Sequence, residues 1–453
     1  MDEIEAVDQV GLGGADQVGQ VGLGGSDQAG QVGLGSSDQV GQVGQVGSDQ
    51  AGLGSSDQVG QVGQVGSDQA GLGGSDQVDP GAARERRLAA FRAAKRVLSR
   101  PGADLTYADS LERLTRRAPE VFDLGRTSDM YGDSIVEELE RRVAGLLGKE
   151  DAAFFPTGTM AQQIAVRVWA GRTGDATVAL HPLAHPERHE RDAFSVVSGV
   201  RSVHPTTEPR LPSADEVREF EEPFGTLMLE LPLREAGFVL PSWQELVDVV
   251  EAARERDAVV HFDGARLWEC GPHFGRGLAE IAELADSVYV SFYKSLEGLG
   301  GAVLAGPRSF VAEAKAWRHR YGGQIFQQYP TVLSALIGLE DELPRLPSYV
   351  AHARVVAEAL REGFTRAGVP FFRVHPEVPH THQFQVWLPY EASVLDEASV
   401  RMAEETGTAL FRRWFAQGPP GISATEVTVA GPGLKWSAED VRLAVGEFVG
   451  RVG

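Results

Sequence analysis

Two apolar segments, AVVHF and SVYVSF, constrain the fold of this 453-residue chain more than any other feature. Both are rich in β-branched and aromatic residues, which predicts buried strands. Asp263 follows the first segment, and Lys294 comes just after the second. The stretch between them predicts a helical connection, so we expect neighbouring strands of an open α/β sheet. Ligands bind at the carboxyl edge of such a sheet.

An Asp and a Lys at neighbouring strand ends suit pyridoxal 5′-phosphate. The aldehyde of this cofactor binds covalently to a lysine amine, and its ring nitrogen needs a carboxylate to stay protonated. Any α/β protein carries some Asp and Lys residues at strand ends, so the pair alone leaves both interpretations open. The GLGG run after Lys294 favours the cofactor, because glycines let backbone pack closely beside a buried ligand.

A second candidate site lies where the predicted strand AAFF meets a helix through Thr157, Gly158 and Thr159. The first-turn N–H groups and the positive end of the helix dipole favour an anion, so this turn is a phosphate candidate. Ser291 could add a hydroxyl to the same phosphate or could only end its strand. Upstream, Ser134 is predicted to cap a core-packing helix, with Glu137 completing a capping box.

Three stretches resemble the threonine aldolase and β-eliminating lyase group of fold type I pyridoxal-phosphate enzymes. They are HFDGARLWE, the Lys294 segment and the most specific one, YGDSIVEELERRVAGLLGKEDAAFFPTGTM. The resemblance extends from about Asp123 to the C-terminus and weakens after about Tyr321. It implies an α/β fold, with a large domain around a mostly parallel sheet (residues 80–345) and a small α+β domain (residues 346–453).

The resemblance also implies roles for individual residues. Lys294 would hold the cofactor, Asp263 would keep its ring protonated, and Thr157-Gly158-Thr159 would bind its phosphate. His185 would stack on the ring and shuttle a proton, a role that suits the neutral-pH titration of histidine, and Glu190 aligns with a family Glu. Arg266 would lie by the phenolic oxygen of the cofactor and the substrate carboxylate.

Two substrate-site candidates rest on weaker signals. Tyr131 belongs to a Tyr-Gly pair that lies near the active site in the family. His382 and His380 sit two apart on one face of an extended segment, where a paired functional role competes with solvent exposure at a strand entry.

The chain departs from the family at its carboxylate clamp. Threonine aldolases carry Thr-Glu-Ile followed by Arg near the C-terminus, whereas this chain has Thr428 at the Arg position. A family Ser that also meets the carboxylate has no counterpart before Tyr131. Either Arg266 holds the carboxylate with help from His380 or His382, or the substrate is not a simple α-amino acid.

These observations predict a cytoplasmic pyridoxal-phosphate lyase that cleaves the Cα–Cβ bond of β-hydroxy-α-amino acids such as threonine. β-Elimination or racemisation of another small amino acid would use the same residues, and a catalytically silent binding protein of this fold is a third interpretation. The family resemblance implies a homodimer or homotetramer with shared active sites.

The first 79 residues are a degenerate repeat of Asp-Gln and Val-Gly-Gln units, which predicts a disordered tail rather than a glycine-rich solenoid. Alternatively, the repeat could lie upstream of the true start codon and not be translated, which would give the same sequence. Residues before Arg84 supply 12 of the 22 net negative charges, and the acidic balance argues against nucleic acid. No apolar run is long enough for a membrane span, and the histidines near His185 show no metal-ligand pattern. The single cysteine, Cys270, fits a reducing compartment.

Overall fold

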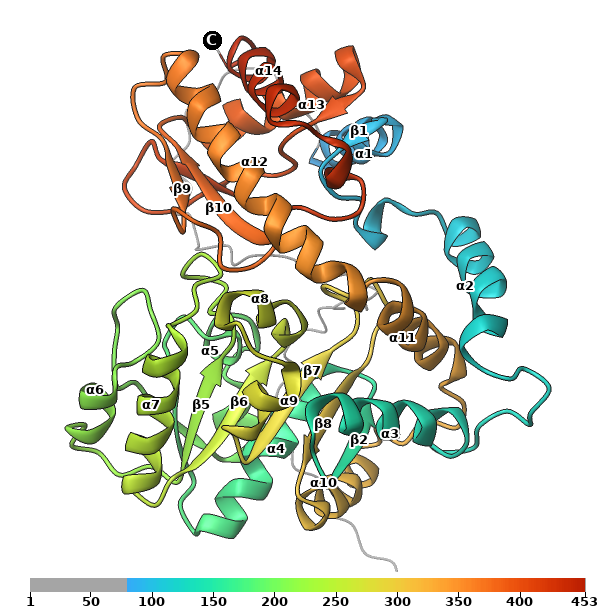
Figure 1. Cartoon of the computed structure of the whole chain (residues 1–453). Helices are drawn as coiled ribbons and strands as arrows, with labels where there is room; N and C mark the ends of the chain where they lie inside the picture. Colours follow the sequence, from blue (N-terminus) through green and yellow to red (C-terminus); the bar gives the residue numbers. More distant parts are fainter. Residues whose placement is uncertain (1–79, 453) are drawn as a thin grey trace, which may run out of the picture. The chain divides into compact units, whose positions relative to one another are not determined.

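The structure, a computed structural model, describes residues 80–452, and the predicted repeat tail of residues 1–79 lies outside them. A seven-stranded sheet forms the centre, in the order β2-β8-β7-β6-β5-β3-β4 (Figure 1). Strand β8 runs antiparallel to both of its neighbours, and the other pairs are parallel. The strands are β2 (Asp151–Phe155), β3 (Thr177–Ala179), β4 (Arg201–Val203), β5 (Thr226–Glu230), β6 (Val259–Gly264), β7 (Ser287–Ser291) and β8 (Ala302–Gly306).

Helices cover both faces of this sheet because its strands are apolar on both sides. Phe155 packs in a cluster with helices α4 (Gly158–Thr173) and α10 (Arg308–Arg320). Its neighbour Phe154 points to the opposite face, as alternation along a strand requires. That face is covered by α3 (Ile135–Leu147), α7 (Trp243–Glu255), α9 (Leu278–Glu283) and α11 (Tyr329–Asp341).

The predicted βαβ unit is present as β5, α7 and β6. The two strands pair in parallel, with Glu230 opposite Asp263 at their carboxyl ends. Strand β7 lies on the other side of β6 and leads directly to Lys294. The sheet therefore brings the polar residues of three strand ends to one edge, and the predicted mostly parallel α/β sheet is confirmed.

A separate antiparallel sheet, β12-β13-β10-β9, forms the C-terminal part, as predicted for an α+β unit (Figure 1). Its helices are α12 (Leu346–Arg366), α13 (Ala392–Thr406) and α14 (Ala438–Val449), and its strands are β9 (Arg373–His375), β10 (Gln383–Leu388), β12 (Phe415–Ala416) and β13 (Ser423–Thr428). Helix α13 ends at Thr406. Gly407 stops it by adopting a φ of 67°.

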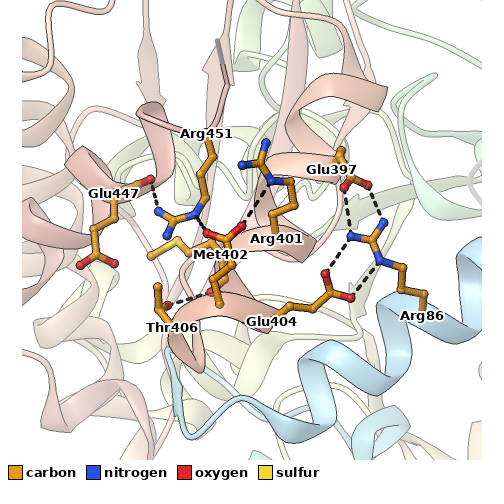
Figure 2. A network of polar contacts seen from close by, with 9 residues as sticks. Arg86, Glu397, Arg401, Met402, Glu404, Thr406, Glu447 and Arg451 are labelled. Atoms are coloured by element: carbon orange, nitrogen blue, oxygen red, sulfur yellow. Dashed lines mark hydrogen bonds and ion pairs between the residues drawn. The ribbon is translucent and has the colours of Figure 1, made fainter.

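The N-terminal helix differs from the expected one over residues 82–99. Helix α1 ends at Ala93, and β1 (Arg96–Val97) then pairs in parallel with β11 (Thr408–Ala409). An apolar cluster that includes Phe91, Val97 and Val400 lies between α1 and α13. At its rim, Arg86 binds Glu397 and Glu404 through two hydrogen bonds each (Figure 2). Exposed ion pairs contribute little alone, so the apolar cluster is the main reason that α1 docks here.

Residues 80–98 therefore pack on the C-terminal part, although the sequence placed them with the large domain. The domain boundaries at residues 79/80 and 345/346 otherwise stay predictions. Short helices connect the remaining parts: α2 (Tyr107–Val121), α5 (His185–His189), α6 (Ala214–Arg218) and α8 (Gly271–Phe274).

The predicted capping box at Ser134 is wrong. Ser134 precedes α3, but its φ of 54° directs the side chain away from the first helical N–H groups, and no capping hydrogen bond forms. Asp133 instead accepts a hydrogen bond from the N–H of Met130 at 2.7 Å. Within residues 80–452, none of the helices combines the length and apolarity that crossing a bilayer requires.

Candidate active site

Lys294 lies three residues beyond β7 at the carboxyl edge of the sheet. Its side chain is partly buried, and its amine has no hydrogen-bond or ion-pair partner in the part of the chain that the structure describes. Burial and the neighbouring charge of Arg266 lower the pKa of Lys294 to about 8, while Asp263 and Glu230 oppose this shift. A substantial fraction of the amine is therefore neutral near pH 7 to 8 and available as a nucleophile.

Asp263 ends β6 and is almost completely buried. Its carboxylate accepts a hydrogen bond from the N–H of Ala265 at 3.1 Å. Burial raises the pKa of Asp263, and the charge of Lys294 and the Ala265 bond pull it back. A buried carboxylate is the partner that a protonated ring nitrogen requires.

Glu230 is a site residue that the sequence reasoning missed. It ends β5 opposite Asp263 and accepts hydrogen bonds from the N–H groups of His185 (2.7 Å) and Arg234 (3.2 Å). Burial and the charge of Asp263 raise the pKa of Glu230 to about 7. The available signal was its position, because TLMLE ends in a carboxylate at the same edge as the strand of Asp263.

Glu190 has a third buried carboxylate near this edge, after those of Asp263 and Glu230. Burial raises its pKa to about 7, while hydrogen bonds from Thr159 and Gln163 work in the opposite direction. The Gln163 amide donates to its carboxylate at 3.3 Å. Glu190 also lies 3.6 Å from Nδ1 of His185, which joins it to the predicted ring-stacking residue.

His185 begins α5, and its backbone is fixed by Glu230. Burial and the charge of Lys294 lower the pKa of His185 to about 3. The expectation that this residue titrates near neutral pH is therefore wrong for this protein, because the surrounding cations and the loss of water disfavour the imidazolium. A neutral imidazole retains the flat face needed for stacking on an aromatic ring, and both predicted roles of His185 stay predictions.

The phosphate candidate forms as expected at the start of α4. Thr157 caps the helix by accepting the N–H of Met160 at 3.2 Å. Gly158 is required because a Cβ at this position would lie 2.1 Å from the hydroxyl oxygen of Tyr289. Helix α4 spans 16 residues, and the first N–H groups of such a helix have no intrahelical acceptor. Thr159 lies in this turn, and its hydroxyl lowers the pKa of Glu190.

Ser291 does not join this phosphate candidate. Its hydroxyl donates to the carbonyl of Ala265 at 2.8 Å, and its side chain is completely buried. The donor that a phosphate would need is therefore committed to the turn after Asp263. The other residues fit pyridoxal phosphate: an unpartnered Lys294, a buried Asp263, and a turn in which Gly158 leaves room for a close approach.

A cleft of about 350 Å³ opens beside Lys294. One wall comes from the large sheet and includes Arg266, Tyr293 and Ser295. The opposite wall comes from Leu98–Gly102 and from the C-terminal part, including Arg412 and Thr428. The hydroxyl of Thr428 accepts a hydrogen bond from Gln383 at 3.0 Å. The position where the family carries an arginine therefore faces the cleft with a short, already bonded side chain.

His382 lines the same cleft, but its exposure differs from the safer prediction of a solvent-facing residue. It is only 3% exposed, because it lies between Glu269 and the ring of Tyr349 in α12. Nδ1 donates to the carbonyl of Val429 at 2.8 Å, and Nε2 lies 2.8 Å from a carboxylate oxygen of Glu269. Burial alone would lower the pKa of His382, but the charge of Glu269 raises it overall.

Glu269 is a further residue that the sequence did not reveal. Burial alone would raise its pKa, but the charge of His382 lowers it overall. The hydroxyl of Ser295, next to Lys294, also donates to this carboxylate. His380, by contrast, accepts the N–H of Leu240 and packs against His273, and it is not among the residues that line the cleft. Its predicted help to Arg266 is therefore wrong.

The comparisons with known proteins agree with this geometry. Residues 120–375 match the family model of the beta-eliminating lyases. This chain belongs to that family. The predicted family, the fold type I architecture, the lyase class and the pyridoxal phosphate cofactor are thereby confirmed.

This beta-eliminating lyase is similar to several threonine aldolases. Low-specificity L-threonine aldolase 1 from Arabidopsis thaliana is 30% identical over 250 residues, which cover 52% of this chain and 68% of the relative. Low specificity L-threonine aldolase from Escherichia coli K12 is 30% identical over 241 residues, covering 52% and 72%. A Listeria monocytogenes crystal structure assigned as an L-allo-threonine aldolase is 33% identical, with a TM-score of 0.73, covering 82% of this chain and 99% of that chain.

Tyr131 lies away from the cleft of this beta-eliminating lyase. It is 55% exposed, its φ is 57°, and it packs edge-on against Phe326 with ring centroids 5.3 Å apart. Its N–H donates to the carbonyl of Phe326 at 2.9 Å. The structure therefore does not bring Tyr131 together with Lys294 within one chain.

Proposed function

We propose that this beta-eliminating lyase cleaves the Cα–Cβ bond of β-hydroxy-α-amino acids. The observation that carries the proposal is Lys294, an unpartnered amine with a pKa lowered to about 8, placed between buried carboxylates and an open cleft. Its relatives named L-threonine aldolases support the same reaction class.

The residues described above fit the cofactor in named places. Lys294 would hold the aldehyde, Asp263 the ring nitrogen, and Thr157-Gly158-Thr159 the phosphate, with His185 against the ring. When bound, pyridoxal phosphate supplies an electron sink for the charge that develops at Cα. Burial raises the pKa of Asp263, and the charge of Lys294 and the N–H of Ala265 oppose that shift and so help to keep the carboxylate that the ring nitrogen needs.

Removal of the β-hydroxyl proton needs a base that is half ionised near neutral pH. We assign this role to Glu190, whose pKa is raised to about 7 and which lies 3.6 Å from His185. The neutral ring of His185 can pass the proton between the hydroxyl and this carboxylate. Glu230 positions His185 through the hydrogen bond from its backbone N–H.

β-Elimination is the second candidate, because it is the reaction in the name of the matching family. The test uses purified holoenzyme with L-threonine, L-allo-threonine and phenylserine. Aldehyde and glycine are expected products of Cα–Cβ cleavage, and the matched Lys294→Ala variant should form neither. Ammonia and a keto acid without aldehyde would replace the aldolase proposal by β-elimination.

We also propose that the enzyme works as a homo-oligomer in the cytoplasm. The exposed side chains of Met130, Tyr131, Ile325 and Phe326 form adjoining apolar loops, which suits a contact between copies. Tyr131 would then contribute to a site of the neighbouring copy. Light scattering should give at least a dimer, with a smaller mass for Tyr131→Asp. A monomeric wild-type enzyme with full activity would contradict the shared site.

A further inference from the structure

The cleft beside Lys294 is also lined by an arginine that the sequence analysis did not single out. Arg412 follows β11, beyond the residues 120–375 that match the family. It lines the cleft together with Arg266 and Lys294. The cleft therefore carries a third cationic side chain in addition to the two predicted from the sequence.

Contacts on two sides hold the Arg412 side chain in place. Nη2 contacts a carboxylate oxygen of Asp104 at 2.5 Å, and Asp104 is buried under the N-terminal segment. The guanidinium centre lies 4.8 Å from the ring centroid of Phe91. These contacts fix the planar group before any ligand arrives, which reduces the entropy lost on binding.

One N–H donor of the Arg412 guanidinium has no hydrogen-bond acceptor among the described residues. Nη1 of Arg412 is buried and has no hydrogen-bond acceptor within residues 80–452. Buried donors in folded proteins nearly always have an acceptor, so an orphan beside a cleft indicates that a ligand supplies one. A carboxylate is the natural acceptor for a guanidinium, because the two planar groups match in geometry and charge.

Other groups near the cleft are less able to receive a carboxylate. Arg234 is not among the residues that line the cleft, and it forms ion pairs with Glu235 and Glu426 at 2.8 and 2.9 Å. Nδ1 of His382 is bonded to Val429 and its Nε2 faces the Glu269 carboxylate, and Thr428 is bonded to Gln383. Arg266 remains available, since its Nε also lacks an acceptor in the described part of the chain. Arg266 and Arg412 thus both line the cleft, and each has one guanidinium nitrogen without an acceptor among the described residues.

We infer that Arg412, positioned by Asp104, binds the substrate carboxylate in place of the arginine that is missing at position 428. The inference rests on the proposed function for the identity of the substrate. The inference also assigns a role to the N-terminal segment. Asp104 holds the Arg412 side chain in place, and residues between Leu98 and Gly102 line the cleft beside it.

The test measures binding of glycine and glycinamide to the holoenzyme by the change in cofactor absorbance. Glycine carries the carboxylate but has no Cα–Cβ bond to cleave, and glycinamide lacks only the negative charge. Arg412→Met should weaken glycine binding about 10- to 100-fold, the range for a lost charge-assisted bond, and change glycinamide binding less than about twofold.

Three variants make this result interpretable. Arg413→Met is the matched control, since the adjacent Arg413 is exposed, and it should bind both ligands like the wild type. Arg412→Lys keeps the charge without the planar fork and should weaken glycine binding at least about fivefold. Asp104→Asn should weaken glycine binding by a smaller factor, because it loosens Arg412.

Cofactor absorbance and thermal unfolding show whether each variant is folded. If Arg412→Met does not retain cofactor, Arg412→Lys decides the question. Glycine binding within twofold of the wild type in the folded Arg412 variant, or an equal loss for glycinamide, overturns the inference. Absence of aldehyde formation by the wild type would instead refute the proposed function, and the glycine titration would still give its own result.

Discussion

Replacing Glu269 by alanine removes the charge partner of the buried His382. Nδ1 of His382 donates to Val429, and Nε2 faces the Glu269 carboxylate at 2.8 Å, so the carboxylate favours the protonated ring and raises the pKa of His382. The two side chains are 4% and 0% exposed. We therefore expect Glu269→Ala to lower the free energy of unfolding by about 3–5 kcal/mol, the usual cost of leaving one member of a buried pair alone.

Glutamine at the same position separates charge from shape. The amide of Glu269→Gln can still accept the Ser295 hydroxyl and can donate to a neutral His382 through Nε2. Its expected cost is therefore that of a neutral replacement, about 1–2 kcal/mol. The difference in free energy of unfolding between the alanine and glutamine variants measures the cost of leaving a cavity and an unpartnered His382.

The pH dependence gives the sign of the charge effect. In the wild type the pKa of His382 is raised, so its contribution is fully present below pH 6.5 and is lost as pH rises through the folded value. The pKa of Glu269 is lowered, so its contribution is present above pH 4.5 and is lost as pH falls through its folded value. Without the carboxylate, burial lowers the pKa of His382, and stability falls as pH drops below 6.5. The difference in free energy of unfolding between the wild type and Glu269→Gln should therefore increase from pH 8 to pH 5.5.

Urea unfolding of the holoenzyme, followed by tryptophan fluorescence at both pH values, measures these differences. Glu112→Gln is the matched control, because its ion pair with Arg116 is 73% and 65% exposed and should change stability by less than about 0.5 kcal/mol. A cost below about 1 kcal/mol for Glu269→Ala, or a gap that does not change with pH, would refute the reasoning.

Three further predictions concern the chemistry. Borohydride reduction should attach the cofactor covalently to the peptide that contains Lys294, as detected by mass spectrometry. The Lys294→Ala variant should lose this label, whereas the control Lys315→Ala should keep it. Labelling of another lysine in Lys294→Ala would contradict the assignment. Glu190→Gln should remove the rise in kcat through about pH 7 that the raised pKa of Glu190 predicts, and an unchanged pH profile would exclude this carboxylate as the base. Thr428→Arg should lower the KM for L-threonine severalfold, with Thr428→Met as the uncharged control, and equal KM values in the two variants would show that position 428 does not reach the carboxylate.

Local sequence patterns were sufficient for the parts of the site that one strand end fixes. Asp263, Lys294 and the Thr157–Thr159 turn lie where an apolar run meets a polar residue, and that boundary is visible in the sequence. The cofactor chemistry follows from the residue types. The family resemblance added His185 and Glu190, which no local pattern singles out.

The remaining features depend on contacts between distant segments. The burial of His382 depends on Glu269, which lies in the turn Leu267–Glu269 after β6, and no periodicity in β10 indicates this partner. Glu230 gains its importance from its register with Asp263. The short β1 exists only because β11 offers it a partner more than 300 residues later. A hydroxyl such as that of Ser291 has its direction set by a neighbouring strand rather than by its own sequence.

The residues that line the cleft come partly from inside and partly from outside the segment that matches the family model. Lys294, Asp263 and His185 lie within residues 120–375, which match the family, whereas Leu98–Gly102 and Arg412 lie outside that range. Substitutions in the outer wall can change which acid is accepted while leaving the reactive lysine and its carboxylates untouched. Exchanging these lining residues between relatives is therefore a direct way to change substrate specificity while the catalytic residues stay the same.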